Sequence, residues 1–378
     1  MQKPALKQLL QTPVGEPITL DPDCCLINDG PSGDIPAMVP QVAPERRAPV
    51  VVMLDHDIPA GSFQSAFRQK ALIDFSRSNS LAFRQSAGIG YQLLQEQLGP
   101  GDLLVTCGEH AAQVGAIGAV GLCFSPEEIA RWLQGGKLTL PAPQVMHIRL
   151  EGDYAPGADA YDIALACAGR KGAEGRLLLL HDHTERGLTL SEKQTLCLLA
   201  HRAGAVSALF AGEDAPADAV LRLDDYPPCA VAPAALPESP MESLPITALA
   251  GIRVDACFIG GCACGRIEEL RKAAEILQGH RIRRELRLLI GFASNADYLQ
   301  AMEEGLIDIF LDCGAQVTNP GCASCLTTSI GVIGDGEVMA STGCFHYSGC
   351  CGTPASRVYL VSARTAAQAA LSGYLYQA

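Results

Sequence analysis

The chain of 378 residues lacks any apolar run that approaches the ~20 residues needed to span a bilayer. Its first residues, Met-Gln-Lys-Pro-Ala-Leu-Lys, lack the apolar core of a secretory signal peptide. Basic residues are outnumbered, because 28 lysines and arginines against 41 aspartates and glutamates give a formal net charge of -13. Such a charge disfavours nucleic acid and anionic membranes as partners. The sequence therefore predicts a cytoplasmic protein that binds neither nucleic acid nor membrane.

Cysteine, by contrast, is abundant, with 16 residues in the chain. A disulfide scaffold with so many cysteines is typical of a short secreted protein, whereas this chain is long and acidic and shows no signal peptide. We therefore expect reduced thiols, some of which bind a metal cluster. Hydrophobic residues make up 48% of the chain, which is enough for a globular protein of two or three domains.

Short apolar strands alternate with helical stretches along the chain, and we find no internal repeat. The expected strands are 49–54, 103–106, 145–150, 177–180, 254–259, 286–290, 307–311 and 358–361. Helices are expected between or after them, for example over 266–277 and 365–375. This alternation predicts an α/β fold with largely parallel sheets flanked by helices. Proline-rich stretches near 140–143 and 227–245 suggest three domains, namely residues 1–150, 151–245 and 246–378.

Three cysteines stand in positions that suit a metal cluster. Cys262 follows two glycines at the end of a predicted strand, and Cys322 and Cys325 form a Cys-x-x-Cys in a loop rich in glycine and proline. One cysteine and a distant pair can hold three corners of a 4Fe-4S cube, which leaves one iron without a protein ligand. An iron with an open site is a Lewis acid that can bind and remove a hydroxyl group. The pattern therefore favours a hydro-lyase over an electron carrier.

Each part of this pattern also has a simpler interpretation. Taken alone, Cys262 is equally compatible with a buried structural cysteine, and Cys-x-x-Cys also occurs in zinc and redox sites. A redox pair would more often open a helix after an early strand, and zinc would usually need a second closely spaced Cys/His pair. The glycine-rich segment 115–121 resembles a dinucleotide-binding loop but lacks the strand–turn spacing, so we expect it to pack against a neighbouring element.

The segment 258–277 resembles the sequence around the first cluster cysteine of the aconitase superfamily, in particular of the large subunits of 3-isopropylmalate dehydratase and homoaconitase. The segment 319–325, Asn-Pro-Gly-Cys-Ala-Ser-Cys, resembles the second cluster loop of that family. Further similar segments follow in family order over most of the chain: 52–59, 101–105, 115–119, 195–197, 203–205, 340–342 and 360–363. The resemblance implies a three-domain large subunit whose 4Fe-4S cluster is held by Cys262, Cys322 and Cys325.

The resemblance also implies active-site residues. His56 and His110 match active-site histidines of the family, and we expect both to move protons. Asp55 is expected to orient the imidazole of His56. The Asp-Ser-His phrase of the family becomes Gly-Glu-His over 108–110, so Glu109 could replace the lost carboxylate if the loop shifted by one residue.

Several family positions are changed in this chain. A family histidine is replaced by Tyr91, and a family glutamate falls near Leu179 in an apolar run. The substrate loop becomes Cys-Phe-His-Tyr-Ser-Gly-Cys over 344–350, which lacks both arginines that clamp substrate carboxylates in the family. We therefore expect a substrate other than citrate, isocitrate or 3-isopropylmalate, unless Arg266, Lys193 or a partner supplies the missing cation. The expected substrate-contacting residues are Tyr91, Phe345, His346 and Cys350.

Additional cysteines lie near these positions. We interpret Cys264, Cys344, Cys350 and Cys351 as small buried side chains, with a thiol-lined pocket as the alternative.

Family members pair this unit with a mobile swivel domain that is fused to it or separate. No such domain follows Ala378, so the resemblance implies a separate small subunit that brings part of the site. The expected function is an iron–sulfur hydro-lyase acting on a small hydroxy acid. Two alternatives stay open: a cluster-bearing sensor or assembly protein that has lost the acid/base residues, and an enzyme that uses the open iron to remove or transfer sulfur.

Overall fold

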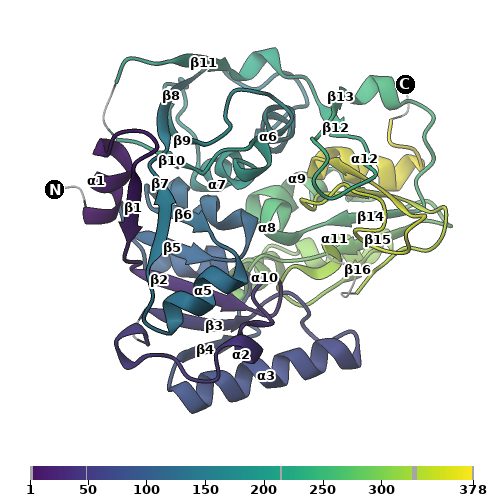
Figure 1. The fold of residues 1–378 in the computed structure, drawn as a ribbon. Helices are drawn as coiled ribbons and strands as arrows, with labels where there is room; N and C mark the ends of the chain where they lie inside the picture. The colour runs from purple at the N-terminus through teal and green to yellow at the C-terminus, as the bar shows by residue number, and fades with distance from the viewer. Residues whose placement is uncertain (1–2, 48, 213–214, 326–329, 377–378) are drawn as a thin grey trace.

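The computed structural model describes residues 3–47, 49–212, 215–325 and 330–376. Its first sheet is entirely parallel and has the strand order β4-β3-β2-β5-β6 (Figure 1). The strands are β2 (Cys24–Asn28), β3 (Val50–Leu54), β4 (Ala82–Gln85), β5 (Leu103–Thr106) and β6 (Val120–Cys123). All five residues of β3 are buried, which explains its continuous run of Val, Met and Leu.

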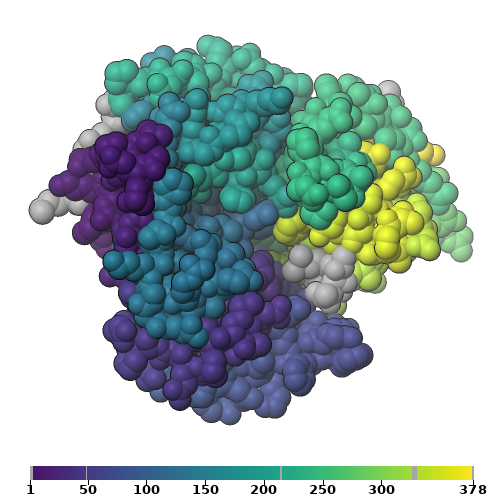
Figure 2. Space-filling model, in the orientation of Figure 1, coloured from purple at the N-terminus to yellow at the C-terminus, as the bar shows by residue number. Residues whose placement is uncertain are grey.

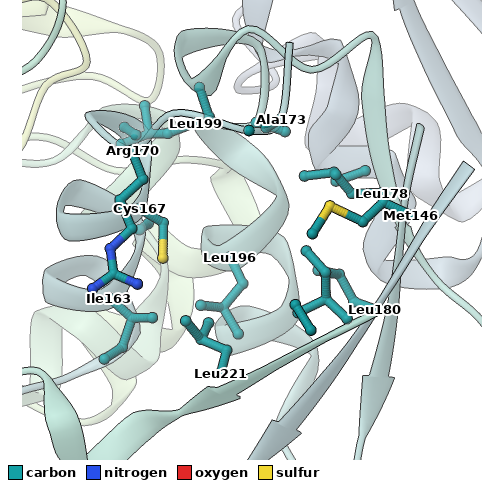
Figure 3. Close-up of a pocket in the computed structure, with 18 of the residues that line it drawn as sticks. Met146, Ile163, Cys167, Arg170, Ala173, Leu178, Leu180, Leu196, Leu199 and Leu221 are labelled. Carbon is teal, nitrogen blue, oxygen red and sulfur yellow. The ribbon is translucent and has the colours of Figure 1, made fainter. Parts of the chain in front are cut away.

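The second sheet is also parallel, with the order β10-β9-β8-β11. Its strands are β8 (Gln144–Glu151), β9 (Arg176–Asp182), β10 (Ser207–Phe210) and β11 (Ala219–Arg222). Side chains of helices α6 (Ala160–Ala168) and α7 (Leu190–Leu198) face one side of this sheet across a cavity (Figure 3).

The third sheet has the order β13-β12-β18-β17-β14-β15-β16 and is parallel except at β12 and β13. Its strands are β12 (Cys229–Val231), β13 (Ser243–Pro245), β14 (Ala256–Ile259), β15 (Arg287–Ile290), β16 (Gln316–Val317), β17 (Val338–Ser341) and β18 (Arg357–Val361). A separate antiparallel pair joins β1 (Pro17–Leu20) to β7 (Leu138–Pro141). These sheets confirm the predicted α/β class with largely parallel strands. The predicted domain limits near 150 and 245 stay predictions.

Helices cover the sheets and connect their strands. The remaining α-helices are α1 (Pro4–Gln11), α2 (Ile35–Met38), α3 (Phe63–Asn79), α4 (Gly90–Leu93), α5 (Pro126–Leu133), α8 (Gly261–Cys264), α9 (Ile267–Leu277), α10 (Asn295–Glu303), α11 (Leu306–Cys313) and α12 (Ala363–Ser372). The 3-10 helices are η1 (Pro44–Arg46), η2 (Leu94–Glu96), η3 (Glu109–Ile117), η4 (His201–Ala203), η5 (Leu223–Asp225), η6 (Ile246–Leu249) and η7 (Ala323–Cys325). Among the described residues, no helix is both long and apolar enough to cross a bilayer.

One expected strand is wrong. Residues 307–311 belong to helix α11, not to a strand. A short apolar run does not by itself distinguish a strand from a buried helix segment. Leu306, Phe310 and Cys313 are buried at helical spacing, and glycines with left-handed backbone conformation, Gly305 and Gly314, delimit the helix.

The segments that carry the candidate site residues follow the carboxyl ends of strands. Residues 55–56 follow β3, 108–110 follow β5, 260–262 follow β14 and 318–322 follow β16. Open α/β sheets place their binding sites at these strand ends. In the space-filling view, the purple-to-blue, teal and green-to-yellow parts of the chain form three adjoining lobes (Figure 2). The site residues therefore come from segments that are far apart in sequence.

The 3-10 helix η3 joins the first two sheets, because it packs on β6, on β10 and on helix α7. Its Gly115 lies directly against the backbone of β10, where an added Cβ atom would overlap the carbonyl oxygen of Ala208 and lie 2.8 Å from the Cα atom of Leu209. The glycine-rich segment thus serves close packing, as expected.

We predict that Gly115→Ala lowers the free energy of unfolding by about 1–3 kcal/mol, because the backbone of β10 is fixed by its sheet and cannot yield. The urea midpoint of the purified protein measures this effect. Gly212→Ala is the control, since an added Cβ atom there has no described residue within 4 Å. Equal midpoints for the two variants would show that η3 and β10 do not pack in this way.

Candidate functional site

Cys262 is positioned by the turn between β14 and α8. Gly260 and Gly261 both have positive φ angles, and an added Cβ atom on Gly260 would lie 2.8 Å from the backbone of Gly291. The turn therefore requires glycine. The carbonyl oxygen of Cys262 accepts hydrogen bonds from Gln113 Nε2 at 2.7 Å and from Arg266 Nη1 at 2.6 Å. These buried donors fix the backbone of Cys262.

Cys322 and Cys325 lie in the loop after β16 and in helix η7. The amide of Cys322 donates to the carbonyl oxygen of Asp55 at 2.9 Å. An added Cβ atom on Gly321, whose φ is +148°, would lie 2.8 Å from that same oxygen. Glycine at 321 thus lets the Cys-x-x-Cys loop rest directly on the Asp55-His56 loop of the first sheet.

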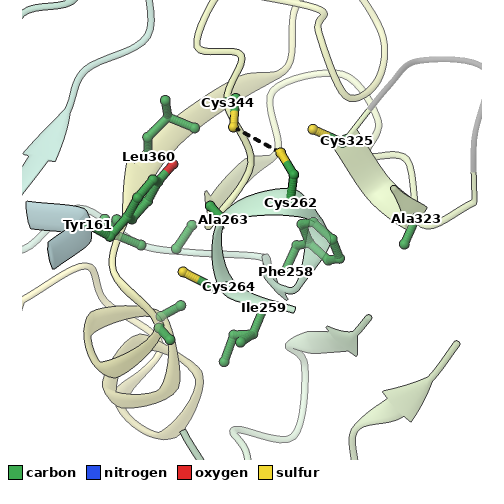
Figure 4. Close-up of a cluster of buried hydrophobic side chains, with 14 of the residues drawn as sticks. Tyr161, Phe258, Ile259, Cys262, Ala263, Cys264, Ala323, Cys325, Cys344 and Leu360 are labelled. Atoms are coloured by element: carbon green, nitrogen blue, oxygen red, sulfur yellow. Dashed lines mark hydrogen bonds between the residues drawn. The ribbon is translucent and has the colours of Figure 1, made fainter. Parts of the chain in front are cut away.

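The three cysteines are buried free thiols, exposed by only 3%, 7% and 4% at Cys262, Cys322 and Cys325. The sulfur atoms of Cys262, Cys325 and Cys344 point toward one another, whereas that of Cys264 points away (Figure 4). The Sγ atoms of Cys262 and Cys344 are 3.6 Å apart. The structure therefore gathers the predicted cysteines and adds Cys344, which the sequence analysis did not place among the ligands.

The cysteines differ in their affinity for protons. A hydrogen bond from Cys344 and the nearby imidazole of His110 lower the pKa of Cys262 well below its usual value, against the effect of burial. Burial raises the pKa of Cys322 to about 11, and burial together with the other two cysteines raises the pKa of Cys325 well above its usual value. Several buried thiolates would repel one another, so this donor set suits a cationic group. Thiolates are the ligands of iron–sulfur clusters, and the residues fit one.

His56 is held by two carboxylates. Its Nδ1 atom lies 2.5 Å from Asp55 Oδ1. Asp29 Oδ1 accepts the backbone amides of Asp55 and His56 at 2.8 and 2.9 Å. Burial would lower the pKa of His56, but Cys322 and Asp55 raise it well above its usual value. Asp29 was not among the expected site residues. It directly follows β2, and its place at the carboxyl end of a strand is the one signal in the sequence that could have identified it.

His110 lies beside Cys262. Its Nδ1 atom is 3.8 Å from Cys262 Sγ, and its ring centroid is 5.7 Å from that of Phe345. In the part of the chain that the structure describes, Nε2 of His110 is buried without a hydrogen-bond partner. A buried polar atom without a partner is costly, which suits an atom that awaits a ligand.

Two changed family positions lie against each other. An added Cβ atom on Gly108 would overlap the hydroxyl of Tyr91, so the tyrosine occupies the space that a side chain at 108 would need. Burial raises the pKa of Tyr91, so its hydroxyl stays protonated at neutral pH. Leu179, near which the family glutamate was expected to fall, is buried in the apolar core of β9.

Glu109 forms an ion pair with Arg202, whose Nε atom lies 2.9 Å from its Oε2 atom. Arg202 also lies over the ring of Phe345, with Cζ 5.1 Å from the centroid. The sequence analysis considered Arg266 and Lys193 as replacement cations. Arg266 instead binds the backbone of the Cys262 turn, while Lys193 lies on Phe210 and 3.4 Å from Asp182. Arg202 is therefore a cation next to loop 344–350, the expected substrate loop, and nothing in the sequence distinguished it.

The substrate loop is compact. Phe345 faces His110, but the Cys350 thiol donates to the carbonyl oxygen of Phe345 at 3.3 Å and lies 3.8 Å from the Cys351 thiol. His346 is fully buried, and burial and the charge of Arg202 lower its pKa. Of the loop residues that were expected to contact substrate, Phe345 lies beside His110.

A sequence model of the Aconitase family (aconitate hydratase) matches residues 38–222 and 234–373. A probable 3-isopropylmalate dehydratase large subunit of Methanothermobacter thermautotrophicus is 31% identical over 355 residues, which cover 86% of this chain and 84% of the relative. A 3-isopropylmalate dehydratase large subunit of Elusimicrobium minutum is 31% identical over 357 residues, which cover 87% and 85%. A probable methanogen homoaconitase large subunit of Methanothermobacter thermautotrophicus is 29% identical over 363 residues, which cover 88% and 83%.

A likeness in three dimensions accompanies these matches. The crystal structure of Thermococcus kodakaraensis aconitase X in its holo form superposes with a TM-score of 0.52 at 12% identity, covering 86% of this chain and 83% of that one. At such low identity the likeness shows the fold alone. The family match extends over most of the chain and includes the segments of all three cysteines, so this chain belongs to the aconitase family.

Proposed function

We propose that the protein is an iron–sulfur-dependent hydro-lyase, a dehydratase or isomerase, that acts on a small hydroxy acid. The observation that carries this proposal is the gathering of buried cysteine thiols between two histidines, His56 and His110. Cys262, Cys322 and Cys325 would hold a 4Fe-4S cluster. Such a cluster, when bound, supplies a Lewis-acidic iron for a substrate hydroxyl.

The two histidines would handle protons beside the cysteines. Asp55 accepts at Nδ1 of His56, and Asp29 fixes the backbone of both residues, so the imidazole keeps one orientation. Its other edge faces Cys322, where it can hold a proton next to the reacting group. His110 presents Nε2, which has no partner among the described residues, and can exchange a second proton there.

Arg202 would bind a substrate carboxylate. Its guanidinium lies on Phe345, and its side chain is only 12% exposed, so a carboxylate there would be held in a partly dry environment. One cation in place of two lost arginines favours a substrate with fewer carboxylates than citrate. Because the relatives are named large subunits, we also propose that a swivel-domain small subunit completes the site.

Cys344 favours a second candidate function. Ligand atoms of His110, Cys262 and Cys344 all lie within 4.8 Å of one another. If Cys344 bound the fourth iron, no open position would remain for a hydroxyl group, and the protein would be a cluster-bearing sensor or assembly protein. We favour the hydro-lyase because the Asp29–Asp55–His56 network is intact, and a sensor has no need for it.

Replacement of cluster cysteines should abolish iron binding. We expect Cys322→Ser to lose the brown colour and the iron that the reconstituted protein binds, because a hydroxyl is a poor substitute for a thiolate. Cys264→Ser is the matched control, since this fully buried cysteine is in the same short helix as Cys262 but points away from the other thiols. Retention of iron by a variant that lacks Cys262, Cys322 and Cys325 would exclude the cluster assignment.

Asp55→Asn should impair turnover without loss of the cluster. The amide cannot stabilise a protonated imidazole as a carboxylate does, so we expect kcat to fall by about 100-fold or more. Asp74→Asn, on the exposed face of α3, is the control. The assay uses reconstituted protein with iron content measured in parallel. Full activity of Asp55→Asn would remove His56 from the proposed proton path.

Substrate preference should reflect the cations of the site. We expect citrate, isocitrate and 3-isopropylmalate to be poor substrates, because each charge-assisted hydrogen bond that is lost costs about 1.5–3 kcal/mol. Arg202→Gln should raise KM for the preferred hydroxy acid by about tenfold or more, whereas Arg253→Gln, an exposed control, should not.

The assay for this preference is a panel of hydroxy acids tested with reconstituted protein, with and without a swivel-domain small subunit from the same organism. Efficient turnover of citrate or 3-isopropylmalate would contradict the assignment of the substrate class. Full activity of the highly purified single chain would contradict the proposed partner.

A further inference from the structure

A cavity lies in the middle part of the chain, and none of its lining residues belongs to the cysteine site. It encloses about 330 Å³ between the second sheet and helices α6 and α7 (Figure 3). Cavities of about 300–1,000 Å³ are typical of small-molecule sites. The hollow is therefore large enough for a small organic ligand.

The wall of this cavity is apolar. Met146, Leu180 and Leu221 point into it from the strands, and Leu196 points into it from α7 (Figure 3). Met146, Leu196 and Leu221 are only half-buried although they stand between a sheet and its covering helices. When an apolar group displaces water from a solvent-accessible hollow, the apolar side chains that line it are removed from water, and the free energy of the system falls.

Small side chains keep the hollow open. Ala164 and Ala168 line it on α6, and Ala208 and Ala219 line it on β10 and β11. Larger residues at these positions would fill the gap between sheet and helices, as they do in a normally packed core. The cavity therefore exists because alanines, and not larger residues, stand on α6 and on the strands β10 and β11 that face it.

The loop between α6 and β9 brings cationic residues to the cavity. The guanidinium of Arg170 runs along the α6 side beside Ile163 (Figure 3) and lies over the ring of Tyr226, with Cζ 4.9 Å from the centroid. Among the described residues, Arg170, Lys171 and Arg176 line it, whereas no carboxylate does.

Glu174 lies near Lys171 and Arg176, but its carboxylate accepts the backbone amide of Gly172. The Nη1 atom of Arg176 lies 3.2 Å from the sulfur of Met146, and a thioether is a weak acceptor. Three cations against one carboxylate leave the cavity wall positively charged.

We propose that this cavity binds a small amphipathic carboxylate, with an alkyl chain of medium length among the leucines and its anionic group at Arg170, Lys171 and Arg176. The apolar wall accounts for the chain, and the cations account for the charge. The proposal is independent of the cluster and of the hydro-lyase activity, because the residues that line the cavity are not those of the cysteine site.

Calorimetric titration of the full, reconstituted chain with octanoate tests the proposal. We expect saturable binding of one octanoate per chain, binding of octanol that is weaker by about tenfold or more, and no measurable binding of acetate. Equal binding of octanol and octanoate would overturn the assignment of the cations, and absence of saturable octanoate binding would overturn the site.

Two variants test the two halves of the cavity. Cys167 points into it from α6, so Cys167→Phe should fill the space and abolish binding (Figure 3). The double variant Arg170→Gln/Arg176→Gln should weaken octanoate binding by about tenfold or more, while Arg222→Gln, an exposed arginine of β11, should not. Octanoate binding that survives both cavity variants unchanged would locate the ligand elsewhere.

Protection of Cys167 provides a readout on the unmodified protein. Cys167 and Cys123 are the two cysteines that are only partly buried, and burial raises their pKa values to about 11 and about 12. Octanoate should slow alkylation of Cys167 by N-ethylmaleimide by about fivefold or more and leave Cys123 unaffected, as measured by peptide mass spectrometry. Identical rates for Cys167 with and without octanoate would overturn the proposal.

Discussion

Several buried thiolates can share one small space only when a cationic group balances their charge. This constraint accounts for the way the loops of the site are built. The turn at Cys262 and the loop at Cys322 both follow strands of the third sheet. The Cys322 loop nevertheless rests on the first sheet, because the amide of Cys322 donates to the carbonyl oxygen of Asp55. Glycine at 321 permits that approach, and Arg266 holds the carbonyl of Cys262. The pKa values of the thiols agree with this constraint. The pKa of Cys262 is lowered, which favours its thiolate, whereas burial raises the pKa of Cys322, which keeps its thiol protonated until a cation is present.

Positions at which this chain differs from the family pattern contact one another or a neighbouring residue, so one change is accompanied by a second. Tyr91 and Gly108 both differ from the family pattern, and the hydroxyl of Tyr91 occupies the space that a side chain at position 108 would fill. In the proposed function, Arg202 would take the place of the arginines missing from loop 344–350, since it reaches that loop from η4 and lies on Phe345. The same arginine pairs with Glu109, so the carboxylate that could have replaced the family acid serves to hold a cation instead. We therefore infer a site with its own specificity and not a degraded one.

Much of the fold was predictable because parallel strands buried on both faces leave continuous apolar runs, as in β3 and β5. Helix α11 was missed because its apolar run is equally short. The cysteines could be predicted because spacing within a loop is a local property. Cys344 and Arg202 could not be placed because their positions depend on how distant segments pack, and no motif records that. The cavity beside α6 and α7 was also invisible, since it arises from alanines on elements that meet only in the folded chain.

The central claim is that one iron of the cluster is left open by the protein, and the lability of that iron tests it most directly. Protein reconstituted with a full 4Fe-4S cluster would be treated with a mild oxidant, and the cluster type would be followed by electron paramagnetic and Mössbauer spectroscopy. The account predicts the loss of one iron, which leaves a three-iron cluster that ferrous iron restores, equally in the unmodified protein and in Cys344→Ala. Retention of all the iron by the unmodified protein, with loss of one iron only in Cys344→Ala, would contradict it, because Cys344 would then be the fourth ligand.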